Sequence, residues 1–364
     1  MAKKFLTINI GSRSKKYSLF DEAGTLVDSI HLEDEHYRDR ADQFFNQPET
    51  VAGIRIVAPG EYFLEHRKID NDYLVKLGQA VKTTPIHLEP VLNEIRMIMA
   101  EHPEMPLYGV SDSTFLASRP LSSRLYGIAM ADTKNLELYR YGYHGLSIES
   151  VMKKLQAQPN LNISRVIICH LGGGMSIVAL KNGRVIDSSM GYSPLEGPVM
   201  SSRVGNIDAA AVLALLRAKQ ISPDDLEKYF NQDCGLKGIS EISQDTKQLL
   251  DQEKAGEQGA QLALEVMTQT IRKQIGAMIA LLGGVDILVF TATIGQRSFI
   301  IRSRIVDGWK DLGIIIDREK NESVPDPITV DPIWIEAAES KTKIAVLNAA
   351  EDKQIYEILQ HQLQ

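Results

Sequence analysis

A repeated β-hairpin is the feature that most constrains the fold of this 364-residue chain. Residues 5–29 read FLTINIGSRSKKYSLFDEAGTLVDS, and residues 166–189 read VIICHLGGGMSIVALKNGRVIDSS. In each copy an apolar strand ends at a polar residue, Asn9 or His170, and a bend rich in glycine, serine or lysine leads into a second apolar run. The copies align with about two residues of gap. We therefore predict two similar domains that face each other, each offering backbone N–H groups to a phosphate.

The length and composition agree with this prediction. A chain of 364 residues is long for one core and suits two domains. The net charge of −7 gives no basic surface for nucleic acid or an anionic membrane, and no apolar run of about 18 residues could span a bilayer. The two cysteines form no disulfide framework, the eight histidines show no zinc-ligand spacing, and the N-terminus enters a strand pattern. These features predict a soluble cytoplasmic protein without nucleic-acid or membrane partners.

Strand, turn and helix patterns alternate along the chain, which predicts an α/β fold. Short apolar runs predict a β-meander over the first 30 residues and strands near 53–57, 107–110, 166–171, 176–180, 184–188 and 286–291. Helical spacing of apolar residues predicts helices near 88–102, 208–218, 223–230, 255–281 and 351–363. We expect the last helix to pack back on the first domain.

Polar residues gather where the predicted strands end, which is where open α/β sheets bind ligands. In the first bend, Asn9–Lys16, small residues let backbone amides approach an anion and Lys16 supplies a charge, although a solvated turn explains the same pattern. The second bend has three consecutive glycines, Gly172–Gly174, which weaken a sheet unless something must approach the backbone closely. A flexible hairpin loop is the alternative there.

Four further residues each have a functional and a structural explanation. Arg55 interrupts an apolar strand, so it meets either a ligand anion or a carboxylate of the core. Asp112 follows a strand and either holds a metal or caps the following helix. His144 lies in an aromatic segment between glycines, where a hydrogen-bonded core histidine is the ordinary explanation. Arg203 precedes a helix, where an ordinary surface charge explains it equally well.

Taken in order, these motifs resemble the acetate kinase family of acetate and propionate kinases over nearly the whole chain. The most specific segments are RYGYHG at 140–145, HLGGG at 170–174 and SSMGYSPLEG at 188–197. The resemblance implies an α/β fold of duplicated actin-like, sugar-kinase domains of the ribonuclease H-like type, with a central cleft between the domains. It implies an N-terminal phosphate and substrate domain at 1–115 plus 350–364 and a C-terminal nucleotide-binding domain at 116–349.

The resemblance also implies a phosphotransferase with a carboxyl group as acceptor. Reversible, direct in-line transfer from ATP to a short-chain carboxylate, acetate or propionate, would give an acyl phosphate with the help of Mg²⁺ or, alternatively, Mn²⁺. The residues it implies for catalysis are Asp112, His144 and Arg203, and those for the metal are Asn9 and Glu351. Those for the substrate are Arg55, Val57, Ile86, Tyr143 and Pro194. Those for the nucleotide are Ser12, Ser14, Lys16, His170, Leu171, Gly172, Gly173, Gly174, Asp245, Thr246, Lys247, Thr293, Ile294, Gly295, Gln296 and Arg297.

Such a reaction needs charge neutralisation more than it needs a base. A carboxylate oxygen is already a nucleophile at neutral pH, but the carboxylate and the phosphoryl group are both anionic. Two arginines, a histidine and magnesium would overcome that repulsion, and each such donor is typically worth about 3–4 kcal/mol of barrier. The resemblance further implies a homodimer whose partners are otherwise only the small carboxylate and the nucleotide.

Several positions depart from the family pattern, mostly on the adenosine side. A GGIGEN-like motif stands here as ATIGQR at 292–297, with Thr293 in place of a glycine, and Lys247 replaces an arginine. The four residues expected at the phosphoryl group are all present. Two alternatives therefore stay open, namely a donor other than ATP, such as pyrophosphate, or a catalytically silent sensor of acyl phosphate or nucleotide.

Overall fold

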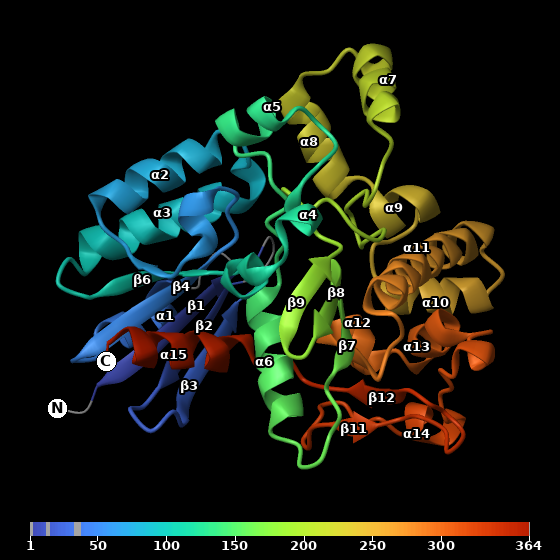
Figure 1. Cartoon of the computed structure of the whole chain (residues 1–364). Helices are drawn as coiled ribbons and strands as arrows, with labels where there is room; N and C mark the ends of the chain where they lie inside the picture. The colour runs from blue at the N-terminus through green and yellow to red at the C-terminus, as the bar shows by residue number, and fades with distance from the viewer. Residues whose placement is uncertain (1–2, 12–14, 33–37, 364) are drawn as a thin grey trace. The chain divides into compact units, whose positions relative to one another are not determined.

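The computed structural model describes residues 3–11, 15–32 and 38–363, and the chain divides into two compact units (Figure 1). The first unit comprises Met1–Ala117, Ile128–Ser150 and Ala350–Gln364, and the second comprises Ser118–Gly127 and Val151–Ala349. Helix α6 (Gly145–Gln156) crosses from one unit to the other without a break. Within the described ranges, each unit contains one six-stranded sheet.

The sheet of the first unit combines an antiparallel hairpin with parallel strands. Its strands are β1 (Lys4–Ile10), β2 (Lys15–Phe20), β3 (Leu26–Leu32), β4 (Thr50–Ile56), β5 (Arg67–Lys68) and β6 (Leu107–Ser111). They lie in the order β3-β2-β1-β4-β6-β5. Strands β1, β4 and β6 run parallel, whereas β2, β3 and β5 each pair antiparallel with a neighbour. The carboxyl ends of β1, β4 and β6 therefore meet at one edge.

Helices pack on both faces of this sheet, because successive strand side chains point to opposite faces. The helices of the unit are α1 (Arg38–Phe45), the short η2 (Glu61–Leu64), α2 (Asn71–Val81), α3 (Pro85–Glu101), the short η3 (Thr114–Ser118), α5 (Met130–Asn135) and α15 (Glu351–Gln362). Leu6 and Ile8 of β1 share a core cluster with Ile95 of α3, whereas Phe5 packs with Tyr356 of α15. The C-terminal helix thus covers one face of the first sheet.

The sheet of the second unit repeats this arrangement. Its strands are β7 (Arg165–Leu171), β8 (Met175–Lys181), β9 (Arg184–Ser188), β10 (Ile287–Thr291), β11 (Ile333–Trp334) and β12 (Lys343–Val346). Their order is β9-β8-β7-β10-β12-β11, so that β7 corresponds to β1 and β10 to β4. Strands β7, β10 and β12 are parallel and β8, β9 and β11 pair antiparallel, as in the first unit.

The repeat extends to an irregularity in the hairpin register. In the first unit the pairing of β2 with β3 shifts between Leu19 and Phe20. In the second unit the pairing of β8 with β9 shifts between Ala179 and Leu180, at the corresponding position. A β-bulge of this kind adds one residue to one strand and increases the local twist. Because strand order and bulge both recur, the duplication predicted from the two hairpin sequences is confirmed.

The second unit is mainly helical outside its sheet. Its helices are α4 (Leu121–Arg124), α7 (Ala209–Lys219), α8 (Pro223–Gln232), α9 (Gly235–Ser240), α10 (Thr246–Lys254), α11 (Gln258–Leu282), α12 (Ala292–Arg297), α13 (Phe299–Val306), the short η4 (Lys310–Leu312) and α14 (Arg318–Glu322). Helix α11 buries Leu264, Ile271 and Met278 at helical spacing, as the sequence predicts. None of the helices described is long and apolar enough to cross a membrane.

Candidate active site

Asp112 lies directly after β6 and is completely buried. Its carboxylate accepts hydrogen bonds from the backbone N–H groups of His144 (2.7 Å) and Leu146 (3.3 Å). These groups stand at the start of α6, where unpaired N–H groups and the helix dipole favour a negative charge. Asp112 is therefore a helix cap, which is one of the two explanations that the sequence allows. The helix that it caps is α6, about 30 residues further along the chain, and not the helix that directly follows Asp112.

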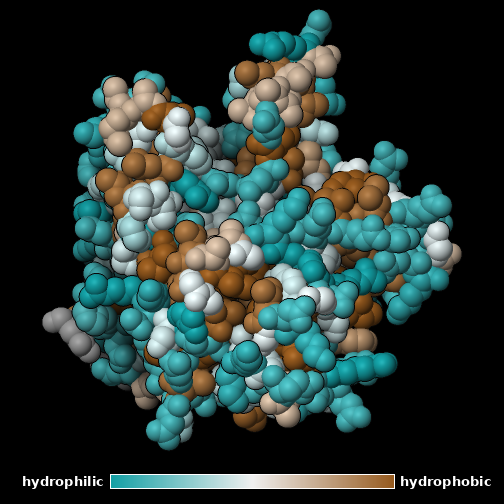
Figure 2. Space-filling view, turned by 45° about the vertical axis from the view of Figure 1, so that its right-hand side comes forward, coloured by the Kyte–Doolittle hydropathy of each residue, from teal (hydrophilic) through white to brown (hydrophobic). Residues whose placement is uncertain are grey.

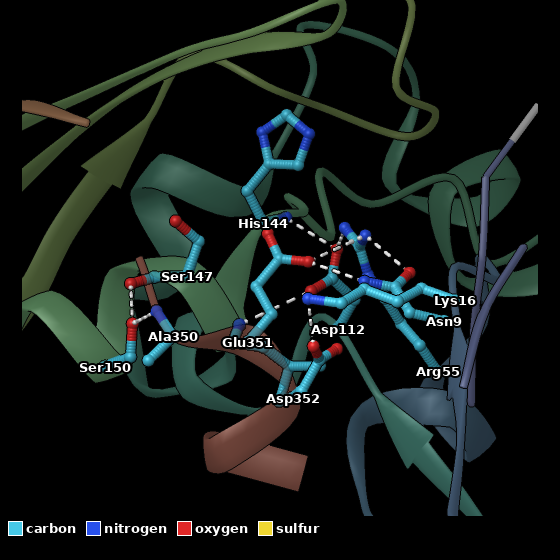
Figure 3. A network of polar contacts seen from close by, with 11 residues as sticks. Asn9, Lys16, Arg55, Asp112, His144, Ser147, Ser150, Ala350, Glu351 and Asp352 are labelled. Carbon is cyan, nitrogen blue, oxygen red and sulfur yellow. Dashed lines mark hydrogen bonds and ion pairs between the residues drawn. The ribbon is translucent and has the colours of Figure 1, made fainter. Parts of the chain in front are cut away.

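The RYGYHG segment owes its glycines to this arrangement. Gly142 and His144 both have left-handed backbones, with φ of 73° and 64°, and together they turn the chain around the Asp112 carboxylate. A side chain at Gly145 would overlap the backbone oxygen of Asp112, which accepts the Gly145 N–H at 2.8 Å. The imidazole of His144 extends away from the carboxylate that its own N–H contacts (Figure 3).

Arg55, near the end of β4, is the centre of a polar network in the first unit (Figure 3). Its Nη2 donates to Oδ2 of Asp112 at 2.7 Å, and its Nη1 donates to Oε2 of Glu351 and Oδ1 of Asn9, both at 3.2 Å. Burial by itself would lower the pKa of Arg55, but Asp112 and Glu351 outweigh it and hold that pKa above its usual value. Burial raises the pKa of the Asp112 carboxyl, and the guanidinium opposes that shift.

The C-terminal helix supplies two carboxylates to this network. Glu351 is its first residue, and Ala350 before it donates its N–H to Oγ of Ser150 on α6 at 3.2 Å. Asp352 forms an ion pair with Lys16 and accepts a hydrogen bond from the hydroxyl of Ser18 at 3.2 Å. The start of α15 is therefore bound to residues of β2.

Asn9 and Glu351 have the chemistry expected of magnesium ligands. The Oδ1 of Asn9 and the Oε2 of Glu351 both accept a hydrogen bond from Nη1 of Arg55 at 3.2 Å, and Nδ2 of Asn9 donates to the same Oε2 at 2.8 Å, so a metal would have to replace these protein donors. Hard cations such as Mg²⁺ prefer oxygen ligands of this kind. Among the described residues no group of three or more histidine, cysteine or acidic side chains could hold a metal. A metal bound here would therefore take most of its ligands from phosphate and water.

His66 is a titratable residue beside the network that the sequence did not single out. Its Nδ1 accepts the backbone N–H of Ser111, the residue before Asp112, at 3.1 Å, and burial lowers the pKa of His66 to about 4. A neutral ring is required for this hydrogen bond, because a protonated Nδ1 is a donor.

We expect the free energy of unfolding to decrease as the pH falls from about 6.5 to 4, because the unfolded chain then binds a proton that His66 in the folded chain does not. The half-buried position of the ring limits the expected loss to about 2 kcal/mol. His66→Asn should remove this part of the pH dependence in urea unfolding at pH 7 and 4.5, whereas His361→Asn, at an exposed position of α15, should retain it. An unchanged profile in His66→Asn would contradict the assignment.

In the second unit the glycine bend lies at the position that corresponds to the first bend. His170, the residue before the last of β7, lies beside Thr291 of β10, and the Gly172 N–H donates to Gly174 O at 3.1 Å. None of Gly172–Gly174 has a left-handed backbone, and a side chain at Gly173 would meet open space. The chain's own fold thus gives no steric reason for glycine at 173.

The loop that carries Arg203 packs against this bend. The N–H of Ser201 donates to Gly173 O at 3.4 Å, and the N–H of Met200 donates to Arg203 O at 3.2 Å. Gly235, at the start of α9, lies so close that a side chain would overlap Met200 O. Arg203 and the glycine bend, predicted separately from sequence, are therefore neighbours within this unit.

The two predicted adenosine segments lie at helix starts. Asp245 caps α10 by accepting the N–H of Gln248 at 2.8 Å. The segment 293–297 lies in α12, which begins where β10 ends. Two residues that depart from the family pattern contact other parts of the unit: Gln296 donates to Leu347 O at 3.1 Å, and Arg297 pairs with Asp326 at 3.1 Å.

Ala292, just before this segment, has a left-handed backbone with φ of 63°. A side chain with a Cβ costs about 1–2 kcal/mol in that conformation. Ala292→Gly should therefore raise the free energy of unfolding by about 0.5–1 kcal/mol in urea titration, after the extra entropy of glycine in the unfolded chain is subtracted. The opposite is expected for Ala280→Gly, at an exposed position of α11, which should lower the free energy of unfolding by about 1 kcal/mol. A loss at both positions would show that Ala292 is not strained.

The remaining predicted residues are divided between the two units. Ser12 and Ser14 lie outside the described residues. Val57 and Ile86 are half-buried and Tyr143 is buried, all in the first unit, whereas Pro194 is buried in the second. Leu171 is buried, and Gly295 packs close to its Cβ.

Two consecutive ribonuclease H-like sheets, each with polar residues at the ends of its parallel strands, define the class of duplicated actin-like, sugar-kinase α/β proteins. The chain belongs to the Acetokinase family, whose model matches residues 35–357. It is 36% identical over 308 residues to the acetate kinase of Thermoanaerobacterium thermosaccharolyticum, covering 84% of this chain and 76% of that protein. The family and fold inferred from the ordered motifs are confirmed.

Two solved structures of similar size agree with this assignment. The acetate kinase of Entamoeba histolytica superimposes with a TM-score of 0.85 at 28% identity, covering 99% of both chains. A propionate kinase from Francisella tularensis subsp. tularensis SCHU S4 superimposes with a TM-score of 0.85 at 27% identity, covering 97% of this chain and 98% of that one.

Proposed function

We propose that this chain transfers the terminal phosphoryl group of ATP to acetate or propionate and forms an acyl phosphate and ADP, reversibly. One observation supports this best: Arg55 is held by Asp112, Asn9 and Glu351 where the parallel strands of the first sheet end. The named relatives supply the substrate class, since they are acetate and propionate kinases. A carboxylate oxygen attacks the phosphorus, the bond from phosphorus to the bridging oxygen breaks, and no proton has to be removed.

Arg55 is proposed to bind the substrate carboxylate. Its guanidinium donates to Asp112 through Nη2 at 2.7 Å, and to Glu351 and Asn9 through Nη1 at the longer distance of 3.2 Å. A substrate carboxylate would compete for Nη1, because the longer hydrogen bonds from Nη1 are weaker than the one from Nη2. Asp112 then has the role of orienting Arg55 instead of acting as a base, which agrees with an acceptor that is already ionised.

The other roles are divided between the two units. His144 and Arg203 are proposed to stabilise the transferring phosphoryl group, together with Arg55. Asn9 and Glu351 are proposed to hold Mg²⁺, with Mn²⁺ as the alternative, and the metal would neutralise phosphate charge. We assign substrate and phosphate binding to the domain 1–115 plus 350–364, with Val57 and Ile86 proposed to contact the acyl group and Ser12, Ser14 and Lys16 in its phosphate bend. Tyr143 and Pro194, which belong to the domain 116–349, are likewise proposed to contact the acyl group of the substrate.

Nucleotide binding is assigned to the domain 116–349. The glycine bend at 170–174 offers backbone N–H groups to the phosphates, and the open space beside Gly173 supports that role. The segments 245–247 and 293–297 are proposed to contact adenosine. ATP remains the proposed donor, because no contact in the described residues favours pyrophosphate or a silent sensor.

Trapping of the acyl phosphate with hydroxylamine tests the proposal. Formate, acetate, propionate and butyrate should each be offered with ATP, GTP or pyrophosphate and with Mg²⁺ present or chelated. We expect saturable product with ATP and with acetate or propionate, and loss of product on chelation. Product with pyrophosphate alone would contradict ATP as donor, and no product with any pair would contradict the enzyme assignment.

We further propose that the protein is cytoplasmic and forms a homodimer. Two buried free cysteines, Cys169 and Cys234, agree with a reducing compartment. Helix α7 has the sequence AAAVLALLRAK but buries no residue, and apolar side chains lie on its surface at the top of Figure 2. Leu213→Glu should convert a dimer to a monomer in light scattering, whereas Leu312→Glu, at an equally exposed leucine, should not. A monomeric wild-type protein would contradict the proposal.

A further inference from the structure

Arg302 is a charged residue that the proposed reaction does not use. It lies on α13, and only 1% of it is exposed, which places it among the largest fully buried side chains of the chain. A buried guanidinium is costly unless its donors are satisfied, so its partners indicate why the fold retains it.

The hydrogen bonds that Arg302 donates within the described residues all go to neutral oxygens. Its Nε donates to Oδ1 of Asn321 at 2.7 Å and its Nη2 to Asn321 O at 2.9 Å. Its Nη1 donates to Gly295 O at 2.9 Å and to Gln296 O at 2.6 Å. Within the described part of the chain no carboxylate pairs with it. Burial lowers the pKa of Arg302 to about 10, so the side chain stays charged at neutral pH.

Gly295 and Gln296 lie at the end of α12, where carbonyl groups lack helical partners and the peptide dipoles favour a cation. Asn321 is itself fixed, because its Nδ2 donates to Phe299 O at 3.0 Å and to Oγ of Ser303 at 2.9 Å. Arg302 therefore connects a rigid anchor on α14 and α13 to the backbone of the segment proposed to contact adenosine.

We propose that Arg302 is a positioning residue that sets nucleotide affinity by holding the backbone of residues 293–297, an inference that rests on the proposed nucleotide role of that segment. The planar guanidinium reaches two carbonyls of α12 and both oxygens of Asn321 at once. A lysine keeps the charge but cannot reproduce that fork. The position of the segment, and not the charge alone, is then what the arginine provides.

The test compares Arg302→Lys with Arg304→Lys, a matched control on the same helix whose guanidinium pairs with Glu253 at 2.6 Å. Binding of Mg-ATP without acceptor, measured by calorimetry, separates affinity from turnover. We expect Arg302→Lys to raise the Kd for ATP about tenfold and to leave the KM for acetate within about twofold. Arg304→Lys should bind ATP as the wild-type protein does. Asn321→Ser should weaken ATP binding about threefold in a protein that retains Arg302.

Thermal melting of each variant shows whether it is folded. If Arg302→Lys is not folded, the ATP affinity of Asn321→Ser decides the outcome. ATP binding at wild-type affinity by whichever of these variants is folded would overturn the inference, as would an equal rise in the KM for acetate. Wild-type protein that binds ATP but forms no acyl phosphate would contradict the proposed reaction alone. Wild-type protein that binds no ATP would contradict both.

Discussion

Replacing Arg55 with methionine is expected to lower kcat at least about a thousandfold and to reduce the free energy of unfolding by about 3–5 kcal/mol at pH 7. Both effects have one cause, since the guanidinium neutralises the completely buried carboxylate of Asp112 and is the proposed contact for the substrate carboxylate. Without it, the contacts that the described residues leave to the Asp112 carboxylate are the hydrogen bonds from the N–H groups of His144 and Leu146.

The pH dependence of this stability loss has a definite sign. Burial already raises the pKa of Asp112 while Arg55 opposes the shift, so removal of Arg55 raises that pKa further. A carboxyl whose pKa is raised on folding takes up a proton in the folded state as the pH falls. The stability deficit of Arg55→Met should therefore be largest at neutral pH and shrink in acid. Urea unfolding across the pH range measures it.

Two controls distinguish the loss of the Arg55–Asp112 ion pair from nonspecific destabilisation of the fold. The double variant Arg55→Met with Asp112→Asn removes the cation together with the carboxylate charge, so it should recover most of the lost stability but not the activity. Arg318→Met removes an exposed ion pair with Glu322 and should cost less than about 1 kcal/mol. A deficit that grows in acid, or a double variant less stable than Arg55→Met, would show that the Asp112 charge is not what Arg55 compensates.

Arg203→Ala should lower kcat about 10²- to 10³-fold with little change in the KM for either substrate. The proposed role explains this pattern, because a cation that contacts charge developing in the transition state contributes little to substrate binding. The loop is held through its backbone by Gly173 and α9, so truncation of the half-buried side chain should leave it in place.

Steady-state kinetics with ATP and acetate varied separately measures the effect. Arg184→Ala, at an exposed arginine of β9, is the matched control and should retain wild-type kinetics. Melting temperatures should agree among the three proteins. A raised KM with kcat unchanged would place Arg203 in substrate binding instead of transition-state stabilisation.

Much of the fold could be predicted from the sequence because the relevant signals are local. The two hairpins are recognisable in the sequence by alternating apolar residues, glycine bends and a repeated V-D-S or I-D-S sequence. The structure adds that both hairpins have the same register shift. Helix α11 was predicted from apolar spacing over a long segment. The family motifs then supplied the site residues, because RYGYHG, HLGGG and SSMGYSPLEG are distinctive as short sequences.

The partners in the site could not be predicted, because each depends on packing between distant segments. Glu351 reaches Arg55 only because α15 packs on the first sheet. The sequence suggests that Asp112 caps the helix after it, yet Asp112 caps α6. The sequence shows Asp352 as an acidic residue next to Glu351 but does not indicate its partner. Nothing in the sequence indicates the roles of Ser150, His66 and Arg302, because an isolated polar residue does not reveal which group it will contact.

The sequence by itself determined the duplication, the α/β class and the chemical types of the site residues, because hydrophobic periodicity and turn residues act over a few positions along the chain. Tertiary structure alone decided that Arg55 shares its charge between Asp112 and Glu351, that Ala292 adopts a left-handed backbone, and that a buried arginine holds the end of α12. These features arise from burial and from hydrogen bonds between segments far apart in the chain, which no local pattern encodes.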